Sequence, residues 1–335
     1  MFQSNVSLLP YNTFSLEAKA RYFYAFKDIN RLQNALKQRD GETLLILGGG
    51  SNILLTQDFE GLVLKNDLKG IEVERETSEH FLVKVQAGEN WHQFVLEAIK
   101  HNWAGIENLS LIPGTVGAAP MQNIGAYGVE IEQVFEELEA LEISTGKMHR
   151  FSHSDCEFGY RESVFKKTLK GQFIICSVTF RLLKEPQFNT SYGAIKETLE
   201  ENGVSELSIQ AISQAVIQIR QSKLPDPAKI GNAGSFFKNP TIDKLDFEGL
   251  KAEFSNIPGY QLPKKQVKIP AAWLIDQCGW KGKTFGEIGV HKNQPLVLVN
   301  YGDGNGENIK DLAFKIQDSV RAKFGIELTP EVNII

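Results

Sequence analysis

The chain has 335 residues, of which 42% are hydrophobic and 23% are charged, and its formal net charge is −5. A chain of this length can bury substantial cores and is expected to form two or three domains. The absence of a basic stripe argues against a nucleic-acid partner, and the lack of a long apolar stretch or a leader-like start predicts no membrane partner and a cytoplasmic location.

The first part of the chain is predicted to mix helices with strands. Asp28 is a candidate N-cap for a short helix that carries Leu32, Ala35 and Leu36 on one side. Further elements follow from periodicity: strands over residues 44–47, 53–55 and 81–87, and a helix over 91–99.

The middle third is predicted to be mostly sheet. Residues 134–143 and 173–182 are long strand candidates, and residues 147–151 are expected to pair between them. Helices are expected over 209–223, where Pro225 and Pro227 mark a domain boundary, and over 308–324, with Gly325 as C′ residue and a short strand from Ile326.

Two glycine-rich segments are the most informative feature. Residues 108–129 run 22 positions without a charge, and Gly48-Gly49-Gly50-Ser51-Asn52 interrupts an apolar strand. Main-chain N–H groups in such turns can hold a phosphate without a cationic side chain. We therefore expect the two segments to bind one dinucleotide. The run at residues 48–52, the first along the chain, lacks the third glycine of a Rossmann fingerprint, and Gly282-Lys283-Thr284 lacks the upstream glycine of a P-loop.

Other candidate sites are weaker on composition alone. Ser235 lies among glycines and aromatic residues in 231–240, without the order of a Ser-His-Asp hydrolase. Arg161 lies among apolar groups where it could clamp a carboxylate. His149 and His153 have helical metal-ligand spacing in a segment that is predicted to be extended, and the three cysteines are far apart, so no metal is expected.

The ordered motifs of the chain resemble one family. The shared segments are Asn12-Thr13-Phe14, residues 48–52, 112–117 and 122–128, Tyr160-Arg161, residues 231–240 and Pro330-Glu331. The chain resembles the UDP-N-acetylenolpyruvoylglucosamine reductases, the MurB family, of the longer type found in Escherichia coli. The resemblance implies an α+β fold with a vanillyl-alcohol-oxidase (PCMH) type FAD-binding domain in two subdomains, 1–68 and 69–224, a third α/β substrate-binding domain at 225–325, and a C-terminal segment 326–335 that returns to the active site.

The resemblance also implies the reaction. NADPH reduces noncovalently bound FAD, and the flavin then reduces UDP-N-acetylglucosamine-enolpyruvate to UDP-N-acetylmuramate for peptidoglycan precursor synthesis. By this resemblance Arg161 and Glu331 stabilise the developing enolate-like dianion, and Ser235 delivers a proton. Glu331 is expected to be protonated, because an ionised carboxylate would repel the developing charge. A monomer is expected.

Binding roles follow from the same resemblance. The cofactor-binding residues are expected to be Gly48, Gly49, Gly50, Ser51, Asn52, Pro113, Gly114, Thr115, Gly117, Asn123, Gly125 and Tyr127. The substrate-binding residues are expected to be Tyr192, Lys223, Asn239, Lys281 and Gln294. Without the resemblance, each of the second group has an ordinary structural explanation, such as a helix C-terminal cation or a turn.

Two alternative functions stay open, and one residue departs from the pattern of the family. The chain could be a flavin oxidase or dehydrogenase of the same cofactor fold acting on another substrate, or a flavin-binding or nucleotide-binding protein without turnover. Many relatives carry an arginine two residues after the catalytic glutamate, whereas this chain has Asn333.

Overall fold

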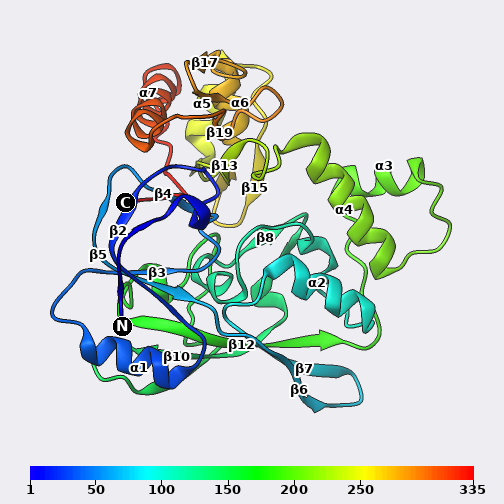
Figure 1. Ribbon diagram of the computed structural model, residues 1–335. Coiled ribbons are helices and arrows are strands. Elements are labelled where there is room, and N and C mark those ends of the chain that lie inside the picture. Colours follow the sequence, from blue (N-terminus) through cyan, green and yellow to red (C-terminus); the bar gives the residue numbers. More distant parts are fainter. The chain divides into compact units, whose positions relative to one another are not determined.

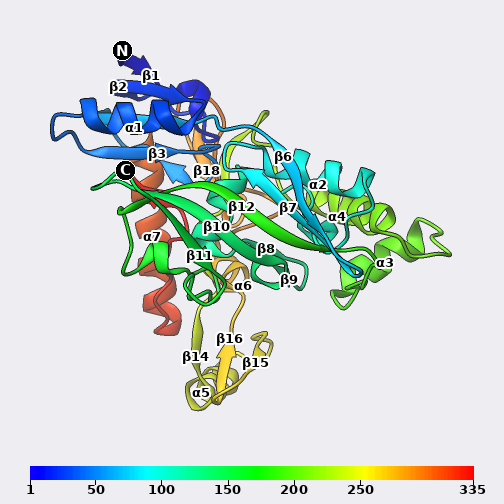
Figure 2. The same cartoon turned by 90° about the horizontal axis from the view of Figure 1, so that it is seen from below.

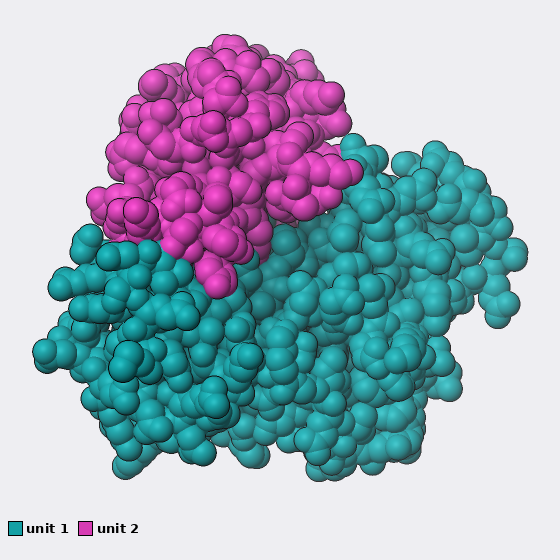
Figure 3. Space-filling model, viewed as in Figure 1, with its two compact units in different colours: residues 1–6, 20–49, 60–222 teal, residues 7–19, 50–59, 223–335 magenta.

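The computed structural model describes residues 1–335, and the chain divides into two compact units (Figure 3). Unit 1 comprises residues 1–6, 20–49 and 60–222, and unit 2 comprises residues 7–19, 50–59 and 223–335. The chain passes from one unit to the other within the first glycine run, between Gly49 and Gly50. None of the helices combines the length and apolar character that a membrane span requires.

An antiparallel sheet of five strands forms the centre of unit 1 (Figure 1). The helix expected over residues 91–99 is confirmed, as are the strands expected over 81–87, 134–143 and 173–182. In the core, Trp91 and Phe94 of the helix pack on Phe180 at ring-centroid distances of 5.8 and 5.1 Å. The elements are β6 (Ile71–Glu76), β7 (His80–Gln86), α2 (Trp91–Lys100), β10 (Phe135–Glu142), β11 (Met148–Ser152) and β12 (Phe173–Leu183), and the strand order is β11-β10-β12-β7-β6.

The expected position of the short strand between the two long ones is wrong. β11 forms a hairpin with β10 and lies at the edge of the sheet, with Leu138 opposite Phe151. The other edge of β10 pairs with β12, where Leu138 faces Val178. β12 has 11 residues and is almost wholly buried, so the central position lets it cover apolar area on both faces.

The predicted first helix connects two strands of the second sheet of unit 1. Its strand order is β1-β2-β5-β3, and β3 runs parallel to β5 with Leu44 opposite Leu62. The Asp28 carboxylate accepts a hydrogen bond from the Arg31 N–H at 2.8 Å, which confirms the predicted cap. The bounds are β1 (Gln3–Ser7), β2 (Lys19–Phe26), α1 (Ile29–Gln38), β3 (Leu44–Leu47) and β5 (Phe59–Asn66).

Two helices follow β12 and build a small core of their own. α4 (Ile209–Lys223) matches the predicted helix, and α3 (Gly193–Glu201) was not expected. Ile195 and Leu199 of α3 pack with Ile212, Val216 and Ile219 of α4. The loop before α3 carries Tyr192, one of the expected substrate-binding residues.

Unit 2 surrounds a four-stranded sheet of order β13-β19-β18-β17. α7 matches the predicted last helix, and Gly325 ends it in the left-handed conformation, with φ 67°. A small lobe of α5 with three strands is visible in Figure 2. The elements are β4 (Ile53–Leu54), β13 (Gly231–Ser235), β14 (Thr241–Asp243), α5 (Lys244–Glu253), β15 (Tyr260–Leu262), β16 (Gln266–Lys268), α6 (Ala271–Gln277), β17 (Thr284–Phe285), β18 (Ile288–Val290), β19 (Val297–Asn300), α7 (Gly306–Phe324) and β20 (Asn333–Ile334).

The predicted strand from Ile326 is wrong in position. Ile326 and Leu328 are buried in the core of unit 2 and belong to no strand. The strand forms later, where β20 pairs in parallel with β4 through Asn333 opposite Ile53. Along this C-terminal segment, the buried apolar side chains therefore come earlier in the sequence than the residues that pair as a strand.

Candidate active site

The two glycine runs meet within unit 1. A Cβ atom placed on Gly49 would lie 2.8 Å from the Gly114 Cα atom, and one placed on Gly48 would lie 2.5 Å from the Thr115 hydroxyl oxygen. Such distances leave no room for a side chain at either position. The sequence prediction that these segments lie together is confirmed for Gly48, Gly49, Gly114 and Thr115. These four uncharged residues are called the glycine surface below.

The second run is held in place by the start of α2. Gly114 has φ 111°, which favours glycine, and its carbonyl accepts from the Trp91 N–H at 3.1 Å. Val116 and Gly117 donate to the carbonyls of Glu89 and Ala87, both at 2.9 Å. Pro113 precedes this anchored stretch, so the expected cofactor-binding residues 113–117 have a fixed backbone.

The main-chain donors of this surface fit an anionic cofactor. The N–H groups of Gly49, Gly114 and Thr115 donate to no protein acceptor, and no charged side chain belongs to either run. Unpaired main-chain donors are costly unless a ligand or water satisfies them. The residues present therefore suit the diphosphate of a dinucleotide such as FAD.

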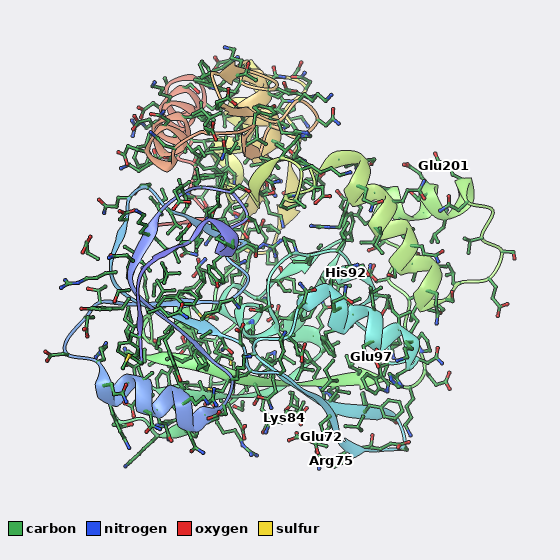
Figure 4. The ribbon with its side chains drawn as sticks, viewed as in Figure 1. Glu72, Arg75, Lys84, His92, Glu97 and Glu201 are labelled. Atoms are coloured by element: carbon green, nitrogen blue, oxygen red, sulfur yellow. The ribbon has the colours of Figure 1, made fainter.

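His92 supports the loop that leads into the second run. Figure 4 shows His92 on α2, and its Nδ1 atom accepts a hydrogen bond from the Leu111 N–H at 3.0 Å. Leu111 has φ 59°, a left-handed conformation that is strained for leucine. Burial, together with the nearby Arg220 charge, lowers the pKa of His92. Neutral His92 thus keeps the acceptor that fixes this turn.

We expect FAD retention to weaken in acid because of His92. A lowered pKa means that the bond to Leu111 is fully present above pH 6.5 and is lost as the pH falls through the folded-state value. Loss of one hydrogen bond of about 1 kcal/mol predicts a severalfold rise in the FAD dissociation constant. Fluorescence titration with FAD across this pH range measures it.

The matched variants isolate His92 from other acid effects. His92→Gln keeps a neutral acceptor and should flatten the acid limb, whereas His101→Gln on the same helix should behave like the unmodified protein. An acid limb that persists in His92→Gln would contradict the assignment to this residue.

A second cluster in unit 1 brings Asn123, Gly125 and Arg161 together. Asn123 is fully buried with φ 41°, and its side-chain amide donates to Glu130 at 2.9 Å and to the Gly159 carbonyl at 3.2 Å. The Arg161 guanidinium donates to the Gly125 carbonyl and lies 3.8 Å from the Glu130 carboxylate. Sequence analysis missed Glu130, because an acidic residue in a charged stretch has no signal of its own.

Tyr127 occupies the tip of a tight hairpin. The two short strands β8 (Gly125–Ala126) and β9 (Val129–Glu130) are joined by Tyr127 and Gly128, which have φ 51° and 82°. Positive φ at both positions is the pattern of a type I′ turn. The Tyr127 ring meets the Tyr192 ring edge-on at 5.1 Å. One expected cofactor residue and one expected substrate residue are therefore neighbours.

Arg220 of α4 lies beside these tyrosines and was not singled out from the sequence. Its charge interacts with Tyr127, and its Nε atom is buried without a hydrogen-bond partner. Burial lowers the pKa of the Arg220 guanidinium and raises the pKa of Tyr127. On the sequence, Arg220 is one polar position in an amphipathic helix, so only the tertiary structure identifies it as a buried cation.

Unit 2 places Ser235 and Glu331 on adjacent segments. Ser235 is exposed at the end of β13, and the buried Phe236 and Phe237 that follow fix its position. The Glu331 N–H donates to the Phe236 carbonyl at 2.7 Å, and Phe237 forms a bridge with Pro330. Two of the three expected catalytic residues are therefore held by one antiparallel pairing.

Three of the four remaining expected substrate residues of unit 2 have contacts within the protein. The Asn239 side-chain oxygen accepts from the Ala271 N–H at 2.9 Å at the start of α6, and Gln294 accepts from the Leu296 N–H at 3.4 Å. Lys281 lies 3.8 Å from Asp276, and Lys223 is exposed at the end of α4. Asn239 is thus tied to the start of α6, whereas Lys223 and Lys281 extend from the surface of the protein.

The chain is similar to known proteins over its full length. Residues 226–335 match the profile "UDP-N-acetylenolpyruvoylglucosamine reductase, C-terminal domain", and residues 20–152 match "FAD binding domain". Curated reductases of that name from Flavobacterium johnsoniae and Amoebophilus asiaticus are 51% and 54% identical, each over 99% of both chains. The crystal structure of the Thermus caldophilus reductase has the same fold, with a TM-score of 0.70, 22% identity, and coverage of 100% of this chain and 99% of that chain.

Proposed function

The chain belongs to the UDP-N-acetylenolpyruvoylglucosamine reductase family, and from this membership we propose how its residues carry out the reaction. The enzyme is an FAD-dependent oxidoreductase of peptidoglycan precursor synthesis. It reduces UDP-N-acetylglucosamine-enolpyruvate to UDP-N-acetylmuramate. FAD, when bound, supplies the chemistry of accepting hydride from NADPH and passing it to the enolpyruvyl group.

The glycine surface of unit 1 is proposed to hold the FAD diphosphate. The free N–H groups of Gly49, Gly114 and Thr115 support this role, as does the absence of competing charge. Glycines 50, 117 and 125, together with Pro113, Ser51, Asn52, Asn123 and Tyr127, complete the proposed cofactor site. Binding is proposed to be noncovalent, so denaturation should release the flavin.

Ser235 is proposed to donate the proton that completes the reduction. Addition of hydride to the vinyl carbon leaves charge on the carbon beside the substrate carboxylate, and that carbon must then be protonated. Ser235 is exposed, carries a hydroxyl proton, and stands on a backbone fixed by two buried phenylalanines. A serine is a weak acid, but a carbanion-like centre is a strong base, so geometry limits the transfer.

Arg161 and Glu331 are proposed to stabilise the developing dianion. The Arg161 guanidinium is held by the Gly125 carbonyl, which leaves its planar fork in a fixed orientation for a carboxylate. Glu331 is proposed to act as a neutral acid in the substrate complex. Tyr192, Lys223, Asn239, Lys281 and Gln294 are proposed to bind the UDP-sugar.

The single observation that carries the catalytic proposal is the pairing of the Ser235 segment with the Glu331 segment. Anaerobic stopped-flow absorbance tests it, with NADPH added first and the enolpyruvyl sugar second. The flavin should bleach with NADPH and recover with the sugar. NADPH oxidation that does not depend on the UDP-sugar would favour an oxidase or dehydrogenase, and a yellow protein that is not reduced would indicate binding without turnover.

Substitution of Glu331 tests the neutral-acid role. Glu331→Gln keeps a neutral hydrogen-bond donor, so flavin reoxidation by the sugar should slow by roughly tenfold or less. Glu331→Asp moves the carboxyl group back by one methylene and should slow it by about a hundredfold. Single-turnover reoxidation rates measure both variants, and the opposite ranking would count against a protonated glutamate.

Location, assembly and subdivision are further proposals. Both substrates are phosphorylated nucleotides of the cytoplasm, which supports a cytoplasmic enzyme. A monomer is proposed, and light scattering would test it. The proposed borders, near residue 68 within the FAD-binding half and near residue 224 at its end, are testable by limited proteolysis.

A further inference from the structure

Asn333, in the short strand β20, lies in a compact hydrogen-bonded arrangement. Its main-chain N–H donates to the Asn52 carbonyl at 3.1 Å, and its side-chain amide donates to the same carbonyl at 3.0 Å. One acceptor thus receives both donors of one residue. Asn52 is the last residue of the first glycine run.

Asn52 in turn holds Glu331. The Asn52 side-chain amide donates to the Glu331 carbonyl at 3.2 Å, while the Glu331 N–H is bound by the Phe236 carbonyl at 2.7 Å. Both main-chain polar groups of Glu331 are therefore engaged, one by the Ser235 segment and the other by Asn52. Val332, the residue between Glu331 and Asn333, is buried in the core of unit 2.

We propose that Asn333 is a positioning residue for Glu331 and acts through Asn52. The two donors of Asn333 fix the peptide group of Asn52, and this fixes the amide that holds the Glu331 carbonyl. The main chain that carries the Glu331 carboxyl group is then fixed relative to the Ser235 segment. Displacement of a catalytic group by about 1 Å can cost roughly a hundredfold in rate, so a weak surface bond can have a large kinetic effect.

The same arrangement joins the acid to the proposed cofactor site. The glycine run preceding Asn52 is fixed at Gly50, whose carbonyl accepts from the Thr13 N–H at 3.1 Å and where a Cβ atom would lie 1.9 Å from the Tyr11 carbonyl oxygen. Asn333 therefore sets the position of Glu331 from the same backbone turn that is proposed to face FAD. This inference rests on the proposed function of Glu331.

The test uses FAD-loaded full-length protein and measures the two half-reactions separately. Asn333→Ala and Asn333→Asp both lack the side-chain donor, and in each we expect the enolpyruvyl sugar to reoxidise the flavin about ten- to a hundredfold more slowly. Reduction by NADPH and the thermal unfolding midpoint should be unchanged. The double variant Asn52→Ala/Asn333→Ala should be no slower than Asn52→Ala alone. Asn333 acts through the Asn52 side-chain amide, and both variants lack that amide.

Thr56→Val is the matched control, because Thr56 binds the last residue of the same C-terminal segment. It removes the Thr56 hydroxyl bond to the Ile335 carbonyl, 2.7 Å long, at the end of the tail remote from Glu331. We expect this variant to match the unmodified protein in both half-reactions. Unchanged reoxidation in Asn333→Ala, an equal slowing of both half-reactions, or an equal slowing in Thr56→Val would overturn the inference. Failure of the unmodified protein to be reoxidised by the sugar would instead refute the proposed function.

Discussion

Ser235→Ala is expected to slow flavin reoxidation by the enolpyruvyl sugar by about 10²–10⁴-fold, the usual contribution of a positioned general acid. Flavin reduction by NADPH should be nearly unchanged, because no proton from Ser235 is needed in that half-reaction. The side chain is exposed on a backbone held by Phe236 and Phe237, so its truncation leaves the fold intact. Anaerobic stopped-flow measurement of the two half-reactions separates these outcomes.

Ser255→Ala is the control for Ser235→Ala. Ser255 is an exposed serine of the same unit that belongs to neither the glycine runs nor the paired segments. It should leave both half-reactions unchanged. If Ser235→Ala slows both half-reactions equally, Ser235 is a structural residue or a cofactor contact, and the proton donor is a different group.

Gly49→Ala is expected to weaken FAD binding. The added methyl group would meet the Gly114 Cα atom at 2.8 Å, and because that atom belongs to a backbone anchored by the Trp91 N–H, the two runs must separate. Overpacking of this kind costs about 1–3 kcal/mol, which corresponds to FAD binding roughly five- to a hundredfold weaker. The purified variant should be pale, and FAD titration should recover the bound flavin only at higher concentration.

Gly249→Ala provides the control for a glycine substitution as such. Gly249 lies in α5, and a Cβ atom there would have nothing within 4 Å. This variant should bind FAD normally and gain about 0.5–1 kcal/mol of helix stability. A Gly49→Ala protein that binds FAD as tightly as the unmodified enzyme would mean that the contact between the glycine runs does not shape the cofactor site.

The effects expected for Gly49→Ala and Ser235→Ala concern different steps of one catalytic cycle. Loss of the glycine surface removes the cofactor and therefore both half-reactions, whereas loss of Ser235 leaves a flavin that can be reduced but is slow to pass its electrons on. Asn333→Ala is expected to resemble Ser235→Ala in kind and to be weaker in extent. A comparison of the three variants therefore distinguishes cofactor binding, proton delivery and positioning.

Local sequence determined most of the regular elements. The cap at Asp28, the apolar period of 209–223 and the glycine that ends α7 depend on neighbours within a few residues, and all three predictions are confirmed. The two glycine runs were also identified from sequence, because uncharged glycine-rich turns between apolar strands have few other uses. Their mutual contact is confirmed for the residues within unit 1.

Only the tertiary structure decided the pairings between distant residues. The edge position of β11, the late strand at Asn333, and the roles of Glu130 and Arg220 as partners of Arg161 and Tyr127 depend on segments that lie far apart in the chain. Periodicity reports which face of an element is apolar, but it carries no information about which other element covers that face. The sequence therefore identified the segments that are proposed to form a flavin site, while long-range packing decided which polar side chains support them.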